Sequence, residues 1–175
     1  MKIKLLLVII LPILGLFLFS CNSQKKFARK KSEYMKSLYA VTKDAINEAE
    51  VTILNDSVKV LFPEHLLFKK GEAYIPDESM PLVERFANLL QKHHRTNILI
   101  NGYTDNTGGF DLNKQLSKRR ADTVRIVLED LEIEKRRIYT WGLGIQNPIG
   151  DNDTEDGKRK NRRVEFIILY SYLHE

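Results

Sequence analysis

Asp105 and Arg120 are the two side chains whose type and surroundings indicate a binding site. Asp105 stands in a glycine-rich loop after the apolar run 98–100, and Arg120 lies about two turns into the following segment. If that segment is a helix with about 100° per residue, Asn113 and Arg120 fall in the middle of an apolar face. A guanidinium among leucines costs free energy unless an anion meets it. We therefore predict a polar recognition site at Asp105 and Arg120. The apolar members of the predicted face are Leu112, Leu116, Val124, Val127, Leu128 and Leu131.

The alternative for this pair is an internal salt bridge that only fixes the loop to the helix. Catalysis is not expected, because hydrolysis needs a paired acid and base, a nucleophile with its base, or a metal. Asp105 has no catalytic partner apparent in the sequence, and Ser117 has no histidine at a suggestive spacing. The adjacent His93 and His94 lack an acid or cysteine spaced to complete a metal site. The sequence therefore predicts neither an enzyme nor a cofactor.

Size and composition fit one domain with a modest core and accessory segments. The chain has 175 residues, 43% of them hydrophobic, and a formal net charge of +5. Removal of Lys2 and Lys4 with the leader described below leaves 26 basic and 23 acidic residues, or +3. That balance does not require nucleic acid as a partner. The single cysteine, Cys21, excludes an internal disulfide.

The N-terminal segment is predicted to be a targeting sequence. Lys2 and Lys4 precede an apolar stretch over residues 5–19, too short for a confident membrane span and typical of a signal peptide over residues 1–20. The last residues, 18–21, resemble a bacterial lipobox, in which the cysteine is lipidated, for example with palmitate, and becomes the mature N-terminus. The alternative is an ordinary secretory signal with an incidental Cys21. By resemblance to the enteric sorting rule, Asn22 directs the lipoprotein to the outer membrane.

Residues 21–50 are predicted to form the lipidated N-terminus and a helical tether. Six residues from Phe27 to Ala49 align on one narrow helical stripe, and neither proline nor glycine interrupts them. Such a stripe should pack on the domain or on a partner helix.

The third segment, residues 51–175, is predicted to be an α/β domain of the α+β sandwich type. Strands are expected at 51–54, 58–62, 98–100, 138–141 and 164–169, and helices at about 81–93 and 111–130. Residues 151–160 are polar and expected to be irregular. This order indicates one mixed sheet with helices on one face. Trp141 is expected in the core or at its edge, with carbohydrate stacking as the alternative.

The order of several motifs resembles the OmpA-like peptidoglycan-binding domain over roughly residues 51–170. The first group lies around the predicted site, and the second follows it. The matching residues are Gly102-Tyr103-Thr104-Asp105, Asn113, Leu116-Ser117, Arg120-Ala121, Gly142-Leu143-Gly144, Asn147-Pro148-Ile149, Asn152, Thr154, Gly157 and Asn161-Arg162-Arg163-Val164. Together with the lipobox, they resemble the lipoprotein members, which include peptidoglycan-associated lipoproteins.

The resemblance implies that Asp105 and Arg120 hold the diaminopimelate residue of the peptidoglycan stem peptide. The free end of that residue is a zwitterion, so Asp105 can pair with its ammonium and Arg120 can bind its carboxylate bidentately. The resemblance also implies that Thr104, Asn113 and Arg162 line or support the same pocket. Leu116 would supply an apolar wall or a backbone contact. In one departure from the family, Lys69 and Lys70 follow Phe68 where many members carry an acid.

The expected function is that of a non-enzymatic protein anchored to the outer membrane by lipid, with its domain in the periplasm. It would bind peptidoglycan non-covalently through diaminopimelate and link the membrane to the cell wall. The alternative is an assembly or scaffold lipoprotein whose N-terminal helix recruits an envelope partner or forms a homodimer.

Overall fold

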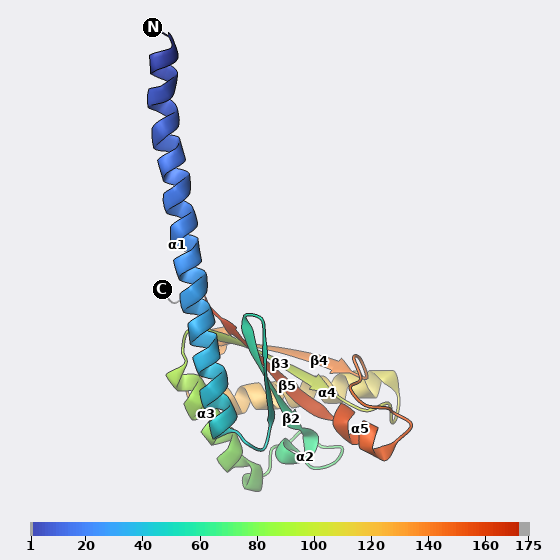
Figure 1. Ribbon diagram of the computed structural model, residues 1–175. Coiled ribbons are helices and arrows are strands. Elements are labelled where there is room, and N and C mark those ends of the chain that lie inside the picture. The colour runs from blue at the N-terminus through green and yellow to red at the C-terminus, as the bar shows by residue number, and fades with distance from the viewer. Residues whose placement is uncertain (1, 172–175) are drawn as a thin grey trace.

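The computed structural model describes the backbone of residues 2–171 and the side chains of residues 24–171. The helices are α1 (Lys2–Ala45), α2 (Glu64–Leu67), η1 (Asp77–Ser79), α3 (Met80–Lys92), α4 (Phe110–Asp130), η2 (Lys135–Arg137) and α5 (Glu155–Asn161). The strands are β1 (Glu50–Leu54), β2 (Ser57–Pro63), β3 (Thr96–Tyr103), β4 (Ile138–Gly144) and β5 (Arg163–Tyr170). Figure 1 shows their arrangement.

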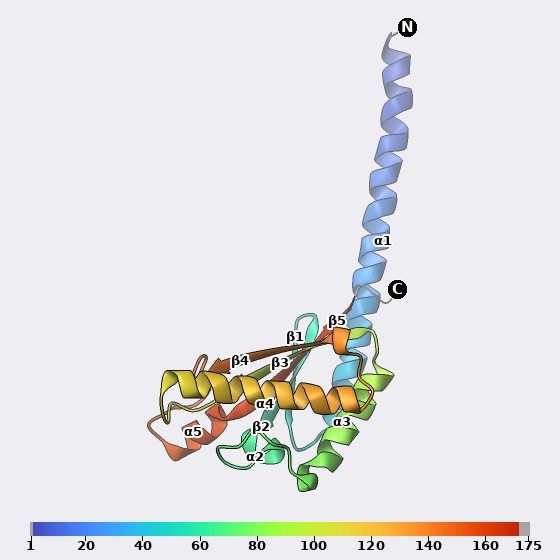
Figure 2. The ribbon, with the colours of Figure 1, turned by 180° about the vertical axis from the view of Figure 1, so that it is seen from behind.

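The five strands form one mixed sheet in the order β1-β2-β5-β3-β4. β3 and β4 are parallel, whereas the other neighbouring strands are antiparallel. A parallel pair needs a crossover connection, and α4 supplies it. Figure 2 shows α4 lying along the sheet, with α3 beside it. The predicted mixed α/β fold is therefore confirmed.

Successive side chains along the strands point to alternate faces of the sheet, and one of these faces is buried. Val164, Phe166 and Ile168 of β5 point towards the helices and are at most 2% exposed. The ring of Phe166 lies edge-on to those of Phe62 and Phe86, with centroids 5.4 and 4.9 Å away. These contacts join β2, β5 and α3 in one core, so the sheet forms a rigid base for the loops at its end.

The C-terminal part of α1 also packs on the domain. Met35 and Leu38 of α1, with Ile46 directly after the helix, are at most 1% exposed and belong to the same hydrophobic core. The Tyr34 hydroxyl lies 3.2 Å from His93 Nδ1 at the end of α3. Burial lowers the pKa of His93, so its neutral form is favoured in this contact. α1 ends at Ala45, four residues before the predicted limit.

Two glycines let α4 approach the sheet closely enough to hold its polar residues at the strand ends. A Cβ on Gly142 would lie 2.4 Å from the Lys118 amide nitrogen, and one on Gly102 would lie 2.1 Å from the Ser117 carbonyl oxygen. Both distances are too short for real contacts, so a side chain at either position would push α4 away from the sheet.

We expect Gly142→Ala to lower the free energy of unfolding by about 1–3 kcal/mol, because the added methyl overpacks the contact between β4 and α4. Urea unfolding followed by circular dichroism measures this effect. Gly109→Ala is the matched control, because the methyl group added there would have no atom within 4 Å and Gly109 has a φ of −78°. Equal stability of the two variants would contradict the close approach.

The structure corrects three local predictions. Leu112 was predicted on the apolar face of α4 but is 68% exposed, because the first turn of α4 extends past the core. Residues 151–160 are not irregular throughout, since α5 begins at Glu155 with the Thr154 hydroxyl accepting a hydrogen bond from the Gly157 amide. Trp141 packs neither in the core nor at its edge: it is 46% exposed on the edge strand β4.

The signal peptide predicted for residues 1–20 and the lipidation predicted at Cys21 lie outside residues 24–171, whose side chains the structure describes. Within the described residues, no helix is both long and apolar enough to cross a membrane.

Candidate ligand-binding site

Polar side chains from several elements surround a cavity of about 330 Å³ near the ends of β3 and β4. All six residues predicted from the sequence to bind peptidoglycan line it. They are Thr104, Asp105, Asn113, Leu116, Arg120 and Arg162. The other lining residues are Glu64, Lys70, Gly71, Thr107, Glu155 and Lys158. The loop after β3, the N-terminal half of α4, the start of α2 and the end of α5 thus converge on one pocket.

Arg120 is 1% exposed and pairs with Glu64, an acid that was not predicted as its partner. Its Nη2 donates to Glu64 Oε1, and its Nε donates to the Glu72 carbonyl oxygen at 2.7 Å. Its guanidinium also lies 5.3 Å from the centre of the Phe68 ring. Burial lowers the pKa of Arg120, and the charge of Glu64 opposes that change. The buried guanidinium is therefore compensated by Glu64 and does not pair directly with Asp105.

Asp105 is held by a second arginine. Arg162 Nη1 donates to Asp105 Oδ2, while Arg162 Nε lies 2.7 Å from Glu64 Oε2. The Thr107 amide donates to Asp105 Oδ1 at 2.9 Å. Burial favours the neutral acid, but the hydrogen bonds from Arg162 and Thr107 outweigh it and leave the pKa of Asp105 below its usual value of 3.8.

The four charged side chains form a continuous chain, Arg120–Glu64–Arg162–Asp105, whose formal charges sum to zero. Glu64 is its central member and joins both arginines. Sequence reasoning missed this residue, although an acid directly after the apolar strand 58–62 and Pro63 was a visible signal. The Glu64 amide also donates to the Arg162 carbonyl oxygen at 2.9 Å, which fixes α2 against the end of α5.

Thr104 lines the pocket and has a buried polar atom without a partner within residues 24–171. Its amide donates to the Gly144 carbonyl oxygen at 2.9 Å, but its buried hydroxyl has no hydrogen-bond partner among the described residues. Asn113 has a different role, because its Nδ2 donates to the Thr107 carbonyl oxygen at 3.0 Å and braces the loop. A buried hydroxyl without a partner costs free energy that a bound ligand can recover.

Lys69 and Lys70, which depart from the family pattern, have different positions in the structure. Lys70 lines the cavity, whereas Lys69 lies 3.9 Å from Glu78. Lys158 also lines the cavity and lies 3.3 Å from Glu155. The cavity therefore combines carboxylates, guanidiniums, an apolar wall at Leu116 and lysines at its rim. Within residues 24–171, no group of three or more His, Cys, Asp or Glu side chains could hold a metal ion.

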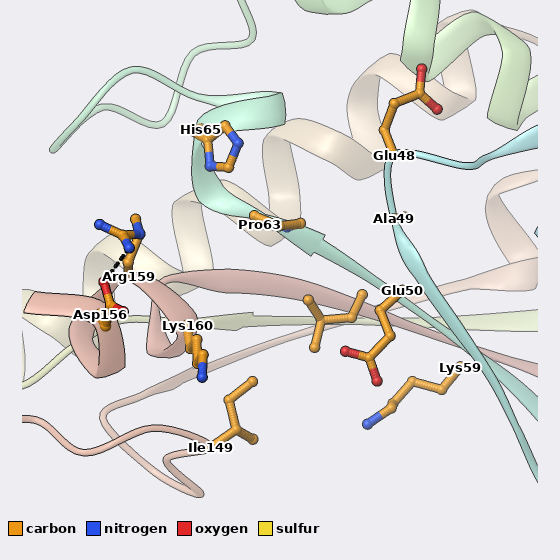
Figure 3. A pocket seen from close by; sticks show the side chains of 11 residues that line it. Glu48, Ala49, Glu50, Lys59, Pro63, His65, Ile149, Asp156, Arg159 and Lys160 are labelled. Atoms are coloured by element: carbon orange, nitrogen blue, oxygen red, sulfur yellow. Dashed lines mark hydrogen bonds and ion pairs between the residues drawn. The ribbon is translucent and has the colours of Figure 1, made fainter.

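A larger cavity of about 740 Å³ lies beside β1 and β2 and is shown in Figure 3. Its charged groups are largely exposed, and three of them already have partners. Asp156 pairs with Arg159, and Glu48 pairs with Arg85 outside the cavity. It contains no buried carboxylate or guanidinium among its lining residues, so the smaller pocket is the stronger candidate site.

The mixed sheet and its charge-balanced pocket define a small α/β domain with a polar cavity at the strand ends. The sequence profile of the OmpA family matches residues 67–162, and the chain belongs to this family.

Individual relatives agree with this assignment. The chain is 37% identical over 118 residues to "Probable lipoprotein YiaD" of Escherichia coli (strain K12), covering 67% of this chain and 54% of that protein. It is 40% identical over 98 residues to "Peptidoglycan-binding protein ArfA" of Mycobacterium tuberculosis (strain H37Rv), covering 56% of this chain and 30% of that protein. The cell wall anchor of the T6SS from Pseudomonas aeruginosa superposes with a TM-score of 0.68 at 26% identity, covering 78% and 97% of the two chains.

Proposed function

We propose that this protein is a lipid-anchored, non-enzymatic linker between the outer membrane and peptidoglycan. The cavity at Asp105 and Arg120 would bind the diaminopimelate residue of the stem peptide. The observation that carries the proposal is the buried Arg120–Glu64–Arg162–Asp105 chain beside the unpartnered Thr104 hydroxyl. Cys21 would carry the lipid, and the domain would lie in the periplasm.

The charge balance of the pocket fits a zwitterion better than a simple anion or cation. An ammonium approaching Asp105 and a carboxylate approaching Arg120 or Arg162 add no net charge to the buried network. Each ligand charge meets a group of opposite sign that the protein already holds in place, so little reorganisation is required. Thr104 can complete a hydrogen bond to the same ligand, and Leu116 can contact its methylene chain.

Membrane anchoring makes modest affinity sufficient for this function. A lipid at Cys21 would confine the domain to the space next to the wall and thereby raise the effective concentration of stem peptides. The names of two relatives, the ArfA protein and the T6SS cell wall anchor, support a role at peptidoglycan. The name of the YiaD relative supports the lipoprotein part of the proposal.

Co-sedimentation with purified diaminopimelate-type peptidoglycan tests the proposal. The mature protein is expected in the pellet, whereas Asp105→Asn and Arg120→Lys are expected to remain in the supernatant. These variants remove the carboxylate charge and the guanidinium fork without opening a large cavity. Arg125→Lys is the control, because Arg125 pairs with Glu129 on α4 and does not line the pocket. Undiminished sedimentation of both pocket variants would contradict the proposal.

Binding is also expected to weaken at low pH, where the Asp105 carboxylate becomes protonated. Because the folded-state pKa of Asp105 lies below 3.8, its carboxylate stays charged from neutral pH down to about pH 4. Its contributions to folding and to ammonium binding are thus retained above pH 3.8 and lost as pH falls through the lowered pKa. Sedimentation of the wild-type protein should persist at about pH 5 and fall only below pH 3.8. A loss of wild-type binding between about pH 7 and 6 would contradict this assignment.

A further inference from the structure

Trp141 and Tyr139 form an exposed aromatic pair on the edge strand β4. Both side chains are 46% exposed, and their rings lie 6.4 Å apart at an interplanar angle of 28°. Neither belongs to the hydrophobic core. Trp141 is the chain's single tryptophan. Large aromatic rings gain stability from burial, so two adjacent exposed rings indicate a surface that another molecule covers.

Trp141 also borders a hollow of about 630 Å³ between β4 and α4. The hollow is lined by Lys114, Gln115, Lys118, Arg119, Thr140, Trp141 and Gly142. Lys118 is held in place there, because its Nζ donates to Asp122 Oδ1 and, at 3.1 Å, to Thr140 Oγ1. The hollow therefore presents amide, guanidinium and ammonium groups next to Trp141 that can donate hydrogen bonds.

Neighbouring residues of α4 line this surface and the pocket at Asp105. Lys114 follows Asn113 directly on α4, and the first lines the hollow while the second lines the pocket. Gly144, three residues after Trp141, accepts a hydrogen bond from the Thr104 amide at the pocket. At about 3.3 Å per strand residue, Trp141 lies roughly 10 Å along β4 from that contact.

We propose that Trp141 and the hollow beside it bind the sugar rings of the glycan strand whose stem peptide occupies the pocket. This inference rests on the proposed function and extends it from the peptide to the glycan. One face of a pyranose carries C–H groups that can stack on the electron-rich face of an indole. The acetamido and hydroxyl oxygens at the ring edge can accept hydrogen bonds from Gln115 and Arg119.

The dimensions of peptidoglycan fit this placement. Diaminopimelate is the third residue of the stem peptide, and three extended residues span at most about 10–11 Å. A stem peptide held by Asp105 can therefore reach back to a sugar at Trp141. The same molecule would then be held at two points, which raises affinity without a second binding partner.

Two probes distinguish binding of the glycan from binding of the stem peptide. One is the free tripeptide L-alanyl-D-glutamyl-diaminopimelate, and the other is the same tripeptide attached to its N-acetylglucosamine–N-acetylmuramic acid disaccharide. Calorimetry should show binding of both, with the disaccharide compound tighter by about three- to tenfold. Because Trp141 is the single tryptophan, its emission reports directly on the proposed site. That emission should shift with the disaccharide compound and not with the free tripeptide.

Trp141→Ala should remove the affinity gain of the disaccharide compound and leave free-tripeptide binding unchanged. Tyr74→Ala is the control, because Tyr74 is 62% exposed and lines neither the pocket nor the hollow. Equal tightening by the disaccharide in wild type and Trp141→Ala would overturn the glycan site and leave the proposed function standing. Failure of wild type to bind either probe would overturn both. An emission shift that follows protein concentration without ligand would instead assign β4 to contacts between copies of the chain and overturn the glycan site.

Discussion

Glu64→Ala is expected to lower the free energy of unfolding by about 3–5 kcal/mol, because removing one partner of a buried ion pair leaves uncompensated charge. Glu64 joins Arg120 and Arg162, and its side chain is only 9% exposed. Its loss would leave a guanidinium that is 1% exposed next to another cation. Urea unfolding followed by circular dichroism measures the change.

The matched control for this prediction is Glu78→Ala. Glu78 also pairs with a basic residue, Lys69, but its side chain is 68% exposed. Exposed ion pairs contribute at most about 1 kcal/mol, so the control should stay close to wild type. A loss of less than about 1 kcal/mol for Glu64→Ala would show that the network does not stabilise the pocket as described.

The double variant Glu64→Gln/Arg120→Met is expected to separate stability from binding. It removes one acid and one base and leaves Arg162 paired with Asp105, so no buried charge loses its only partner. Replacing a buried ion pair by residues of similar volume is often neutral or stabilising. We therefore expect stability within about 1 kcal/mol of wild type, well above that of Glu64→Ala.

Ligand binding by the same double variant should nevertheless fall by at least about 30-fold. The ligand carboxylate would lose the guanidinium at Arg120, and a truncated buried charge pair costs about 2 kcal/mol or more. Calorimetry with a diaminopimelate tripeptide measures the affinity, and urea unfolding measures stability on the same sample. A stable double variant with wild-type affinity would exclude Arg120 from ligand binding.

The sequence allowed prediction of those parts of the site that are governed by local spacing. Asp105 and Arg120 stood out because one loop leads directly into one helix, and the structure places both at the same pocket. Glu64 did not stand out, because its contact with Arg120 spans 56 positions in the chain. Pairing over such a distance depends on the strand order, which places β2 next to β5 and brings α2 to the end of α5.

The incorrect local predictions have related causes. Helical periodicity assigned Leu112 to the apolar face but cannot show where a helix extends past the core. The polar composition of 151–160 concealed α5, although Thr154 followed by Glu155 and Asp156 was a visible helix start. Trp141 was wrongly assigned because successive side chains of β4 point to opposite faces of the sheet. Ile138 is buried, while Tyr139 and Trp141 are exposed on the other face of the strand.

The central claim is that the pocket recognises the zwitterionic end of diaminopimelate. Calorimetric titration of the wild-type protein with two stem tripeptides tests it most directly. One tripeptide carries diaminopimelate, and the other carries lysine at the same position, which keeps the terminal ammonium and lacks the adjacent carboxylate. We predict that the diaminopimelate tripeptide binds at least about 30-fold more tightly, because only its carboxylate can pair with the guanidiniums of Arg120 and Arg162. Equal affinity for the two tripeptides would contradict the claim.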